Sequence, residues 1–448
     1  MSTAKGAAEV IAALLAQAGL DLPVRLRAWD GSEAGPRGGP VLVARSPRAL
    51  QRILWRPGEL GLARAYVSGD LDVEGDLTDG LRRVHATAPR PGPFGLIKTG
   101  PAAVAAAARL GLLAPPREPP RCELRVRGRR HSRARDRAVI AGHYDVPSAF
   151  YQLILDPSMA YSCAYWDGQK DLSGAQQGKL DLIMSKLALE PGQALLDVGC
   201  GWGSLTIHAA RARVRVTGVT LSREQGGFVR RRARGLGLNL DVRIQDYRDP
   251  LDGTYDAIAS VEMGEHVGAD RYPAFCAALY RRLRPGGRLL IQQMSRTTRR
   301  GGGPFIESYI APDMDMRPVG DTIRLIQDAG FEVLGVEAMR EHYVRTIRAW
   351  LARFKASAAP GQIMDRGLWR YTRHPNYFGD SCVWWGIFLV CASTWPGVLT
   401  ILSPVAMTYF LVFATGAKLL EKTMMQRPGY PEYAARTSMF FPLPPKRP

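Results

Sequence analysis

A run of alternating glycines follows an apolar segment near the middle of this chain of 448 residues. Residues 194–198 have the apolar pattern of a buried strand, and Gly199, Gly201 and Gly203 follow at alternate positions. An α/β sheet builds a nucleotide pocket in this way at the carboxyl end of its first strand, because glycines let the backbone approach a ligand closely. Trp202 stands where a dinucleotide loop needs room for a pyrophosphate, which favours S-adenosylmethionine over NAD. The alternatives are another nucleotide and a purely structural turn.

Strand-like and helix-like segments alternate through residues 138–358, which we take as one domain. Strands are expected at 194–198, 214–219, 241–245, 257–261 and 288–294, and helices between them include 222–236 and 272–283. Pro285-Gly286-Gly287 is expected to separate the second of these helices from the last strand. Strands separated by helices predict an α/β fold with a mostly parallel, doubly wound sheet.

The residues before this domain divide into two regions. Residues 1–87 combine a helical start at 7–20 with a strand-like segment at 40–44, which predicts a small α+β domain. Residues 88–137 are rich in Pro and Ala and then in Arg, which predicts a linker with a short helix at 102–113. The arginines of its basic end are either solvated or in contact with lipid phosphates.

The region after the central domain, residues 359–448, contains a long uncharged stretch. The 37 residues between Asp380 and Lys418 include no Asp, Glu, Lys or Arg. A spanning helix needs about 20 apolar residues, so the stretch predicts a helical membrane hairpin that turns at residues 394–397. Trp384, Trp385 and Trp395 suit a membrane interface. The alternative is a buried helical hairpin of a soluble domain.

The charge balance indicates an anionic partner. Sixty Lys and Arg residues against 41 Asp and Glu residues give a net charge of +19, which suits nucleic acid or an anionic membrane surface. An arginine-rich coding bias would give the same balance. The six cysteines are scattered without C-x-x-C pairs, which predicts no metal site and suits a reducing cytoplasm.

Polar residues follow the second and third predicted strands, where the ribose, methionine and adenine groups of a cofactor would lie. The candidates are Thr220, Leu221, Ser222 and Gln225 after the second strand, and Gln245, Asp246 and Tyr247 after the third. Asp246 is expected to accept a hydrogen bond from the adenine amino group, and its alternative role is that of a turn residue. Ser222 is also a good N-cap for the next helix.

A set of motifs in order along the chain carries a resemblance to a known family. The motifs are His143-Tyr144-Asp145-Val146, Phe150-Tyr151, Tyr161-Ser162-Cys163-Ala164-Tyr165-Trp166, the glycine loop, Thr220 to Gln225, Gln245 to Asp249, Glu265-His266-Val267-Gly268 and Arg340-Glu341-His342-Tyr343. Together they resemble the cyclopropane-fatty-acid synthase and mycolic-acid methyltransferase family over about residues 10–355. The resemblance implies a Rossmann-like class I methyltransferase fold. It also implies that Tyr161, Ser162 and Asp197 help to bind the cofactor, with His143 and Tyr151 near the substrate.

The resemblance implies methyl transfer from S-adenosylmethionine to the double bond of an acyl chain, usually in a membrane phospholipid. Methylation of an alkene makes a carbocation, so the pocket must be apolar and still hold a negative charge nearby. In the family a bicarbonate ion supplies that charge and acts as the base. Its ligands carry over to Cys163, Glu265 and Tyr343, and His266 is expected to fix the acid.

One position departs from the family pattern. The cyclopropane synthases usually carry a His and then, two positions on, an Ile after the fifth strand, where this chain has Gln292 and Met294. Glutamine can donate a hydrogen bond to an anion but cannot take a proton near neutral pH. Together with the segments 292–296 and 305–314, this resembles the actinobacterial branch that makes 10-methyl or 10-methylene fatty acids. We therefore expect a methylene- or methyl-branched product, with a cyclopropane ring as the alternative.

The last region resembles a second family, the membrane reductases with a steroid 5-alpha-reductase-like C-terminal part. Arg373, His374, Tyr377 and Glu421 match positions that help to bind a nucleotide cofactor there, so NADPH is a candidate ligand. The alternative is an anchoring relic, because the earlier membrane helices of that family are absent. The chain then resembles two neighbouring proteins joined by loss of what lay between, and saturation of a methylene intermediate would need a separate reductase.

These observations lead to one expectation and two alternatives. We expect an enzyme at the cytoplasmic face of an anionic membrane, with its C-terminal region inserted, that acts on unsaturated phospholipids; a homodimer is left open. The alternative from another class is an inactive lipid-binding fusion protein. A nucleic-acid methyltransferase would want an N/D-P-P-Y/F motif or an RNA-binding module, and the sequence shows neither, so no nucleic-acid partner is expected.

Overall fold

The computed structural model describes residues 6–17, 21–87, 104–114, 118–144, 148–250, 252–297, 302–357, 367–393, 395, 397–414, 417–426 and 429–446. The chain divides into two compact units, Met1–Thr346 and Ile347–Pro448, and the division falls inside helix α14 (Arg340–Ser357). The predicted boundary at 358/359 lies outside the described residues.

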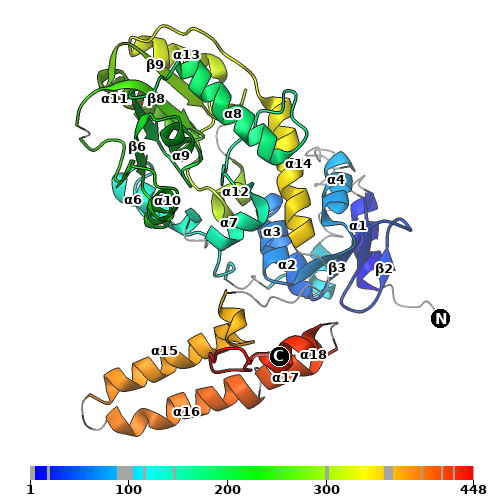
Figure 1. The fold of residues 1–448 in the computed structure, drawn as a ribbon. Helices are drawn as coiled ribbons and strands as arrows, with labels where there is room; N and C mark the ends of the chain where they lie inside the picture. Colours follow the sequence, from blue (N-terminus) through cyan, green and yellow to red (C-terminus); the bar gives the residue numbers. More distant parts are fainter. Residues whose placement is uncertain are drawn as a thin grey trace, which may run out of the picture. The chain divides into compact units, whose positions relative to one another are not determined.

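A five-stranded parallel sheet forms the centre of the first unit (Figure 1). Its strand order is β7-β6-β5-β8-β9, with β5 (Ala194–Val198), β6 (Arg215–Thr220), β7 (Asp241–Ile244), β8 (Tyr255–Val261) and β9 (Leu283–Gln292). The chain leaves β5 toward β6 on one side and later returns to β8 on the other. Ligands bind at such a reversal of strand order, outside the carboxyl ends of the strands. The predicted doubly wound fold is confirmed.

Helices cover both faces of this sheet because successive residues of each strand point to opposite faces. Leu195 packs into a core with α8 (Leu172–Leu187) and α9 (Ser204–Arg211). Its neighbour Leu196 packs into a second core with α11 (Tyr272–Arg282) and α13 (Val319–Asp328). The remaining helix of this layer, α10 (Arg223–Gly235), contributes Val229 to a smaller core beside α9. Burial of each such side chain contributes about 1.5–3 kcal/mol, so the strand ends that carry the site are held by two packed layers.

The last strand begins earlier than the sequence predicts. Pro285-Gly286-Gly287 lies inside β9 and does not separate it from α11. Gly286 has a φ of +75°, and a Cβ on Gly287 would lie 2.8 Å from the carbonyl oxygen of Asp256. The two glycines therefore let the strand continue through an irregularity opposite Tyr255 and Ala257.

A small domain precedes the central sheet within the same unit. Its sheet has the order β2-β1-β3-β4, with β1 (Arg25–Arg27), β2 (Glu33–Ala34), β3 (Val41–Ala44) and β4 (Leu71–Glu74). Its helices are α1 (Ala7–Gln17), α2 (Pro47–Trp55), α3 (Glu59–Val67) and α4 (Leu77–Thr87). The end of the helix predicted at 7–20 lies outside the described residues. The Arg64 guanidinium is paired with Glu123 at 2.6 Å, and the Leu124 N–H donates to the Ser308 carbonyl at 2.8 Å, which ties this domain to the central one.

The basic segment before the central domain is engaged by the protein itself. The helix predicted at 102–113 is seen over 104–109, and its start lies outside the described residues. The segment forms the start of α6 (Arg133–Tyr144), which precedes α7 (Ser148–Ile154). Arg135 pairs with Asp313, Arg133 with Asp249, and Arg130 with Glu307. Arg135 is therefore largely removed from solvent, contrary to expectation, whereas the side chains of Arg130 and Arg133 stay mostly exposed beside their partners.

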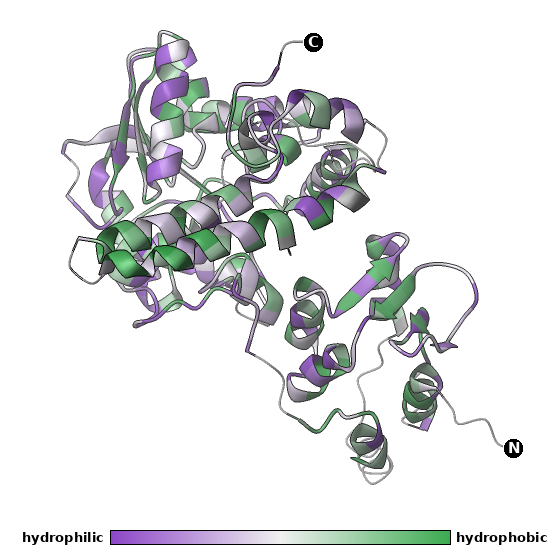
Figure 2. Ribbon diagram, turned by 90° about the horizontal axis from the view of Figure 1, so that it is seen from below, coloured by the Kyte–Doolittle hydropathy of each residue, from purple (hydrophilic) through white to green (hydrophobic). Residues whose placement is uncertain are grey.

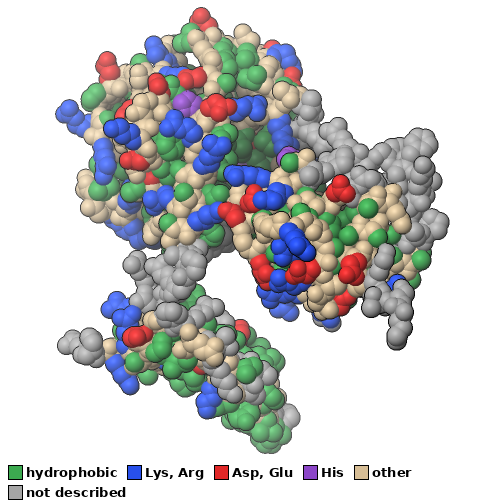
Figure 3. All heavy atoms as spheres, turned by 90° about the vertical axis from the view of Figure 1, so that its right-hand side faces the viewer, with side chains coloured by type: hydrophobic (Ala, Val, Ile, Leu, Met, Phe, Trp, Pro, Cys, Tyr) green, Lys and Arg blue, Asp and Glu red, His purple; other side chains and the backbone are tan. Residues whose placement is uncertain are grey.

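The second unit contains an apolar helical hairpin. It comprises α15 (Pro375–Cys391), η4 (Gly397–Ile401), α16 (Leu402–Tyr409), the π-helical η5 (Phe410–Ala414), α17 (Ala417–Met424) and α18 (Tyr430–Arg436). The hairpin is closed by a 2.8 Å hydrogen bond between the hydroxyls of Ser381 and Thr408, while Trp385 donates to Thr408 at 3.2 Å. Hydropathy colouring shows hydrophobic residues along both helices (Figure 2), and hydrophobic side chains gather on the surface of this unit (Figure 3).

The prediction of two membrane spans is only partly met. Among the described residues one helix, Gly397–Glu421, is long and apolar enough to cross a membrane, with a mean hydropathy of 1.9. The other apolar helix, Tyr377–Cys391, is shorter than the roughly 20 residues that a span requires. Thr394 and Pro396 of the predicted turn lie outside the described residues.

Candidate functional site

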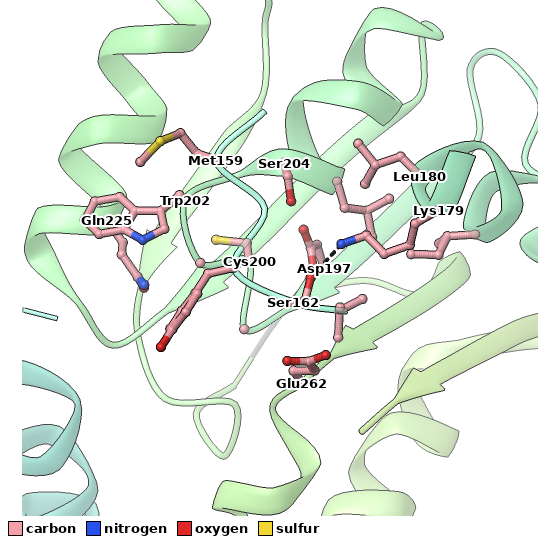
Figure 4. A pocket seen from close by; sticks show the side chains of 16 residues that line it. Met159, Ser162, Lys179, Leu180, Asp197, Cys200, Trp202, Ser204, Gln225 and Glu262 are labelled. Carbon is pink, nitrogen blue, oxygen red and sulfur yellow. Dashed lines mark hydrogen bonds between the residues drawn. The ribbon is translucent and has the colours of Figure 1, made fainter. Parts of the chain in front are cut away.

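A cavity opens at the carboxyl end of β5, where the glycine loop begins (Figure 4). Of the residues predicted to bind the cofactor, it is lined by Tyr161, Ser162, Asp197, Gly199, Gly201, Trp202 and Gln225. It is not lined by Gly203, Thr220, Leu221, Ser222, Gln245, Asp246 or Tyr247. The strand end and the glycine loop therefore form the wall that the sequence predicts, and of the candidates after the second and third strands Gln225 lines the cavity while the others do not.

The three glycines of the loop have different roles. All have positive φ values, +84° at Gly199, +52° at Gly201 and +80° at Gly203. A Cβ on Gly201 would meet no atom within 4 Å, so this position borders open space. A Cβ on Gly203 would lie 2.7 Å from a methyl group of Val229, so this glycine permits close packing of α9 against α10. Only the first part of the loop is available to a ligand.

Aromatic and acidic side chains shape the walls of the cavity. The ring of Trp202 is buried between Tyr151 and Phe228, with centroids 5.3 Å from each, and Tyr151 also contacts Tyr161. Burial raises the pKa of Asp197 to about 6, although its carboxylate accepts a 2.7 Å hydrogen bond from Thr206. His143 lies in α6, and its side chain is outside what the structure describes.

The polar residues after β6 and β7 form hydrogen bonds with neighbouring residues of the chain. The Thr220 hydroxyl donates to the Gln225 amide oxygen at 2.8 Å, and Ser222 accepts from the Gln225 N–H at 3.2 Å as the N-cap of α10. Arg248 engages both carboxylate oxygens of Asp246. The Asp246 carboxylate thus has a charged partner within the chain, and its hydrogen bond from the adenine amino group stays a prediction.

The predicted anion ligands converge on a residue that the sequence analysis did not select. The carboxylate of Glu262 accepts hydrogen bonds from the Cys163 N–H at 2.6 Å, the Gln292 amide at 3.2 Å and the Tyr343 hydroxyl at 3.3 Å. Glu262 directly follows β8 and also lines the cofactor cavity. Its position at the carboxyl end of a central strand was a signal that could have identified it.

Glu265, the predicted acid, lies next to this cluster and does not share its hydrogen bonds. Its side chain is buried, and among the described residues neither carboxylate oxygen has a hydrogen-bond partner. The expected role of His266 in fixing Glu265 stays a prediction. Burial, and then the nearby charge of Glu262, raise the pKa of Glu265 to about 8. Burial also raises the pKa of Glu262, which its three donors oppose. The donors favour the charge on Glu262 and the proton on Glu265.

A buried lysine also lies near these carboxylates, and the sequence analysis did not select it. Lys179 of α8 is 1% exposed, and its ammonium donates to the Ser162 hydroxyl at 2.6 Å (Figure 4). Burial lowers its pKa to about 8, while the nearby Glu262 carboxylate acts in the opposite direction. Lys179 shares the buried face of the helix with Gln176 and Leu180. Polar residues on an otherwise apolar helical face were the sequence signal for this position.

Helix α14 holds the Cys163 segment and Tyr343 in place. Thr346 accepts hydrogen bonds at 3.0 Å from both the Ala164 N–H and the Trp166 indole N–H, and the His342 ring accepts from the Trp166 N–H at 2.8 Å. Burial raises the pKa of the Cys163 thiol to about 12, so Cys163 contributes its backbone N–H and not a thiolate. Burial also raises the pKa of Tyr343, which keeps its hydroxyl a donor.

The four residues predicted in the tail meet in the second unit. Glu421 accepts two hydrogen bonds from Arg373 at 2.9 and 3.0 Å, one from Tyr430 at 2.8 Å, and lies 2.9 Å from His374 Nε2. The rings of His374 and Tyr377 are stacked with centroids 5.5 Å apart. The carboxylate is thus surrounded by partners from the chain itself.

Comparisons with known proteins find relatives of the central domain and of the C-terminal region. Residues 131–367 match the family model described as mycolic acid cyclopropane synthetase, and residues 331–437 match one described as a protein of unknown function (DUF1295). The chain is 40% identical over 354 residues to "Probable fatty acid methyltransferase Rv3720" of Mycobacterium tuberculosis, covering 73% of this chain and 80% of that protein. It is 31% identical over 370 residues to "Tuberculostearic acid methyltransferase UfaA1" of the same organism, covering 78% and 82%.

Two further comparisons concern cyclopropane synthases. The chain is 37% identical over 265 residues to the "Cyclopropane-fatty-acyl-phospholipid synthase" of Escherichia coli, covering 58% of this chain and 68% of that one. A solved structure of the mycolic acid cyclopropane synthase CmaA1 complexed with SAH and CTAB is similar with a TM-score of 0.46 and 31% identity, over 50% of this chain and 84% of that chain.

Proposed function

Because the chain belongs to the mycolic acid cyclopropane synthetase family and is a methyltransferase of the fatty-acid-modifying kind that depends on S-adenosylmethionine, we propose that its substrate is an unsaturated acyl chain within a phospholipid. The product is a methylene- or methyl-branched chain. The observation that carries this proposal is the hydrogen-bonded carboxylate of Glu262 at the edge of the cofactor cavity. A fixed negative charge stabilises the cation that alkene methylation creates.

The residues around the cavity suit a sulfonium cofactor. Its sulfonium charge makes the methyl group electrophilic enough to be attacked by an alkene, and Gly199, Gly201 and Tyr161 would hold the cofactor beside the carboxyl end of β5. Gly201 leaves space for close approach, and the carboxylates of Asp197 and Glu262 border the same cavity. Carboxylates here favour a cationic ligand over a polyphosphate one.

The reaction balances without a redox step up to the methylene product. The alkene π electrons form the bond to the methyl carbon, and the C–S bond pair remains on sulfur, which leaves a carbocation on the adjacent chain carbon. A 1,2-hydride shift places the cation on the methyl-bearing carbon, and loss of a proton from the methyl group gives the methylene chain. Loss of the same proton without the shift closes a cyclopropane ring, which is the alternative product. A saturated methyl branch additionally needs hydride and a proton, supplied by a separate reductase.

The apolar C-terminal unit supports the proposal that this chemistry takes place at a membrane. The apolar helix Gly397–Glu421 anchors the protein at the cytoplasmic face, and the net charge of +19 favours an anionic surface. The Arg373–Glu421 cluster serves as part of the anchor's own fold, and NADPH binding there is the second candidate role, because its residues are those named by the reductase resemblance.

Expression in a host rich in monounsaturated phospholipid tests the proposal. We expect extracted phospholipids to gain one CH2 unit per modified chain, with the label of methyl-labelled S-adenosylmethionine, and NMR to show vinylidene protons. NMR signals of a cyclopropane ring alone would select the alternative product. Label in free fatty acids but not in phospholipids would reject the substrate class, and no label in any lipid would reject the methyltransferase reaction.

A further inference from the structure

We propose that Glu262 supplies, from within the chain, the anion that the family resemblance assigns to bound bicarbonate, and that its carboxylate accepts the proton lost by the methylated chain. The inference rests on the proposed function. Its starting point is that the donors expected to hold bicarbonate, the Cys163 N–H, the Gln292 amide and the Tyr343 hydroxyl, all donate to Glu262.

The site does not fit a separate bicarbonate. Both carboxylate oxygens of Glu262 are used, Oε1 by Cys163 and Gln292 and Oε2 by Tyr343. A bicarbonate would have to displace this carboxylate from its donors and would then share the site with the displaced negative charge of Glu262. Buried like charges without compensating partners are strongly unfavourable. The donor set therefore serves one anion, and the chain already provides it.

The backbone holds Glu262 in an unusual conformation that directs it to these donors. Its φ of +49° is in the left-handed region, which non-glycine residues seldom adopt. The Glu262 N–H donates to the Gln292 carbonyl at 2.6 Å. Gln292 of β9 therefore contacts both the backbone and the carboxylate of Glu262. Figure 4 shows the carboxylate directed toward the cavity near Ser162. Residues held in such conformations cluster at functional sites, where the surroundings compensate the strain.

Glu262 can accept the proton that the methylated chain loses, because the neighbouring Glu265 is already protonated. After the hydride shift, a C–H bond of the new methyl group breaks, its electron pair forms the second bond of the C=CH2 group, and Glu262 Oε takes the proton. Gln292 cannot take it, because an amide has no basic lone pair near neutral pH. Glu265 carries a proton before the reaction, so the buried pair holds one negative charge before proton transfer and none after it. The assignment makes the reaction independent of dissolved bicarbonate.

Two substitutions at the same position separate an internal anion from a bound one. Glu262→Gln fills the same volume without charge, so neither the carboxylate nor bicarbonate can occupy the donors. Glu262→Gly empties that volume and suits the positive φ, so the three donors become available to an added anion. Glu190→Gln, at an exposed glutamate, is the matched control.

The assay uses the purified full-length protein, vesicles of monounsaturated phospholipid and methyl-labelled S-adenosylmethionine, in CO2-free buffer with and without sodium bicarbonate. We expect the wild type and Glu190→Gln to be unaffected by bicarbonate. Both Glu262 variants lose roughly 10²–10⁴-fold in rate. Added bicarbonate restores at least about tenfold to Glu262→Gly and nothing to Glu262→Gln. Calorimetry in the presence of S-adenosylhomocysteine detects bicarbonate binding only to Glu262→Gly.

Other results of these experiments would contradict either the role of Glu262 or the proposed function. A wild type that loses activity in CO2-free buffer and regains it with bicarbonate, or a Glu262→Gln variant with wild-type rate, overturns the inference while methyl transfer stands. A wild type that transfers no label in either buffer rejects the proposed function. In that case calorimetry still tests Glu262, because bicarbonate binding by the wild type contradicts the inference. Binding of S-adenosylhomocysteine by each variant shows that it is folded.

Discussion

Each of the two units contains a cluster of side chains around one glutamate, and the partners differ in charge. Glu262 in the first unit receives hydrogen bonds from an amide N–H, a glutamine and a phenol, all of which are neutral. Glu421 in the second unit is paired with the Arg373 guanidinium and contacts His374 and Tyr430. Neutral donors leave a carboxylate able to take a proton, whereas a bidentate arginine stabilises its charged form. The comparison therefore predicts a reactive carboxylate in one unit and a structural one in the other.

The largest expected effect is the loss of the ion pair in the second unit. Arg373→Leu leaves the partly buried Glu421 without its guanidinium partner, and breaking such a pair costs up to about 3 kcal/mol, the lower end of the range for fully buried pairs. We expect limited proteolysis of the full-length protein to cleave the second unit more rapidly, while the rate of methyl transfer in detergent stays within about twofold. Arg370→Leu, at an exposed arginine of the same unit, is the control. NADPH binding by the wild type that Arg373→Leu abolishes without destabilisation would instead make this cluster a binding site.

The second prediction tests whether the neutral hydrogen-bond donors set the pKa of Glu262. Tyr343→Phe removes one hydrogen bond to the carboxylate, which is worth about 1.5–3 kcal/mol when the acceptor is charged. We expect the rate of methyl transfer to fall by about 10- to 100-fold and the acid limb of its pH profile to move to higher pH, because the charged form loses a donor. An unchanged acid limb would show that Tyr343 does not contact the titrating group.

The buried acid pair predicts how stability changes with pH. The pKa of Glu265 in the folded protein is raised to about 8, above its unfolded value of about 4.3. Its contribution to stability is therefore present at low pH and lost as the pH rises toward 8, at up to about 1.4 kcal/mol per pH unit. Glu262, Arg317 and Tyr343 are the ionisable groups that influence it, and burial is the main cause.

Substitution of Glu265 tests whether this residue causes the loss of stability as the pH rises. Glu265→Gln removes the titrating proton, so we expect the free energy of unfolding to fall less steeply between pH 5.5 and 7.5 than in the wild type. Denaturant unfolding of the full-length protein at several pH values measures the slope, with Glu190→Gln as the control. A slope that stays the same in Glu265→Gln would place the proton on Glu262 instead.

Much of the first unit follows from local patterns in the sequence. The apolar run at 194–198 becomes β5 at the same residues, and the glycines after it have the positive φ values that such a loop requires. The early start of β9 was missed because Pro285 and Gly286 normally interrupt a strand, and only contact with β8 keeps the chain extended there.

The site was harder to predict, because its chemistry depends on contacts between distant segments. Cys163, Gln292 and Tyr343 were expected around an anion, but their convergence on Glu262 requires a left-handed backbone that no propensity of glutamate favours. Asp246 was taken as a ligand for the cofactor because it follows a strand, and its engagement by Arg248, two residues on, was overlooked. Lys179 was not selected from the sequence although it lies on the buried face of α8.

The smallest expected effect separates residues that bind the cofactor from residues that only stabilise the fold around it. Ser222 accepts a hydrogen bond from the Gln225 N–H at the start of α10 and does not line the cavity. Ser222→Ala should therefore cost about 1 kcal/mol of stability as a lost N-cap, with no change in the KM for S-adenosylmethionine. Ser222→Asp, which preserves the cap, should restore the stability. A rise in KM in Ser222→Ala at unchanged stability would place Ser222, like its neighbour Gln225, in the cofactor site.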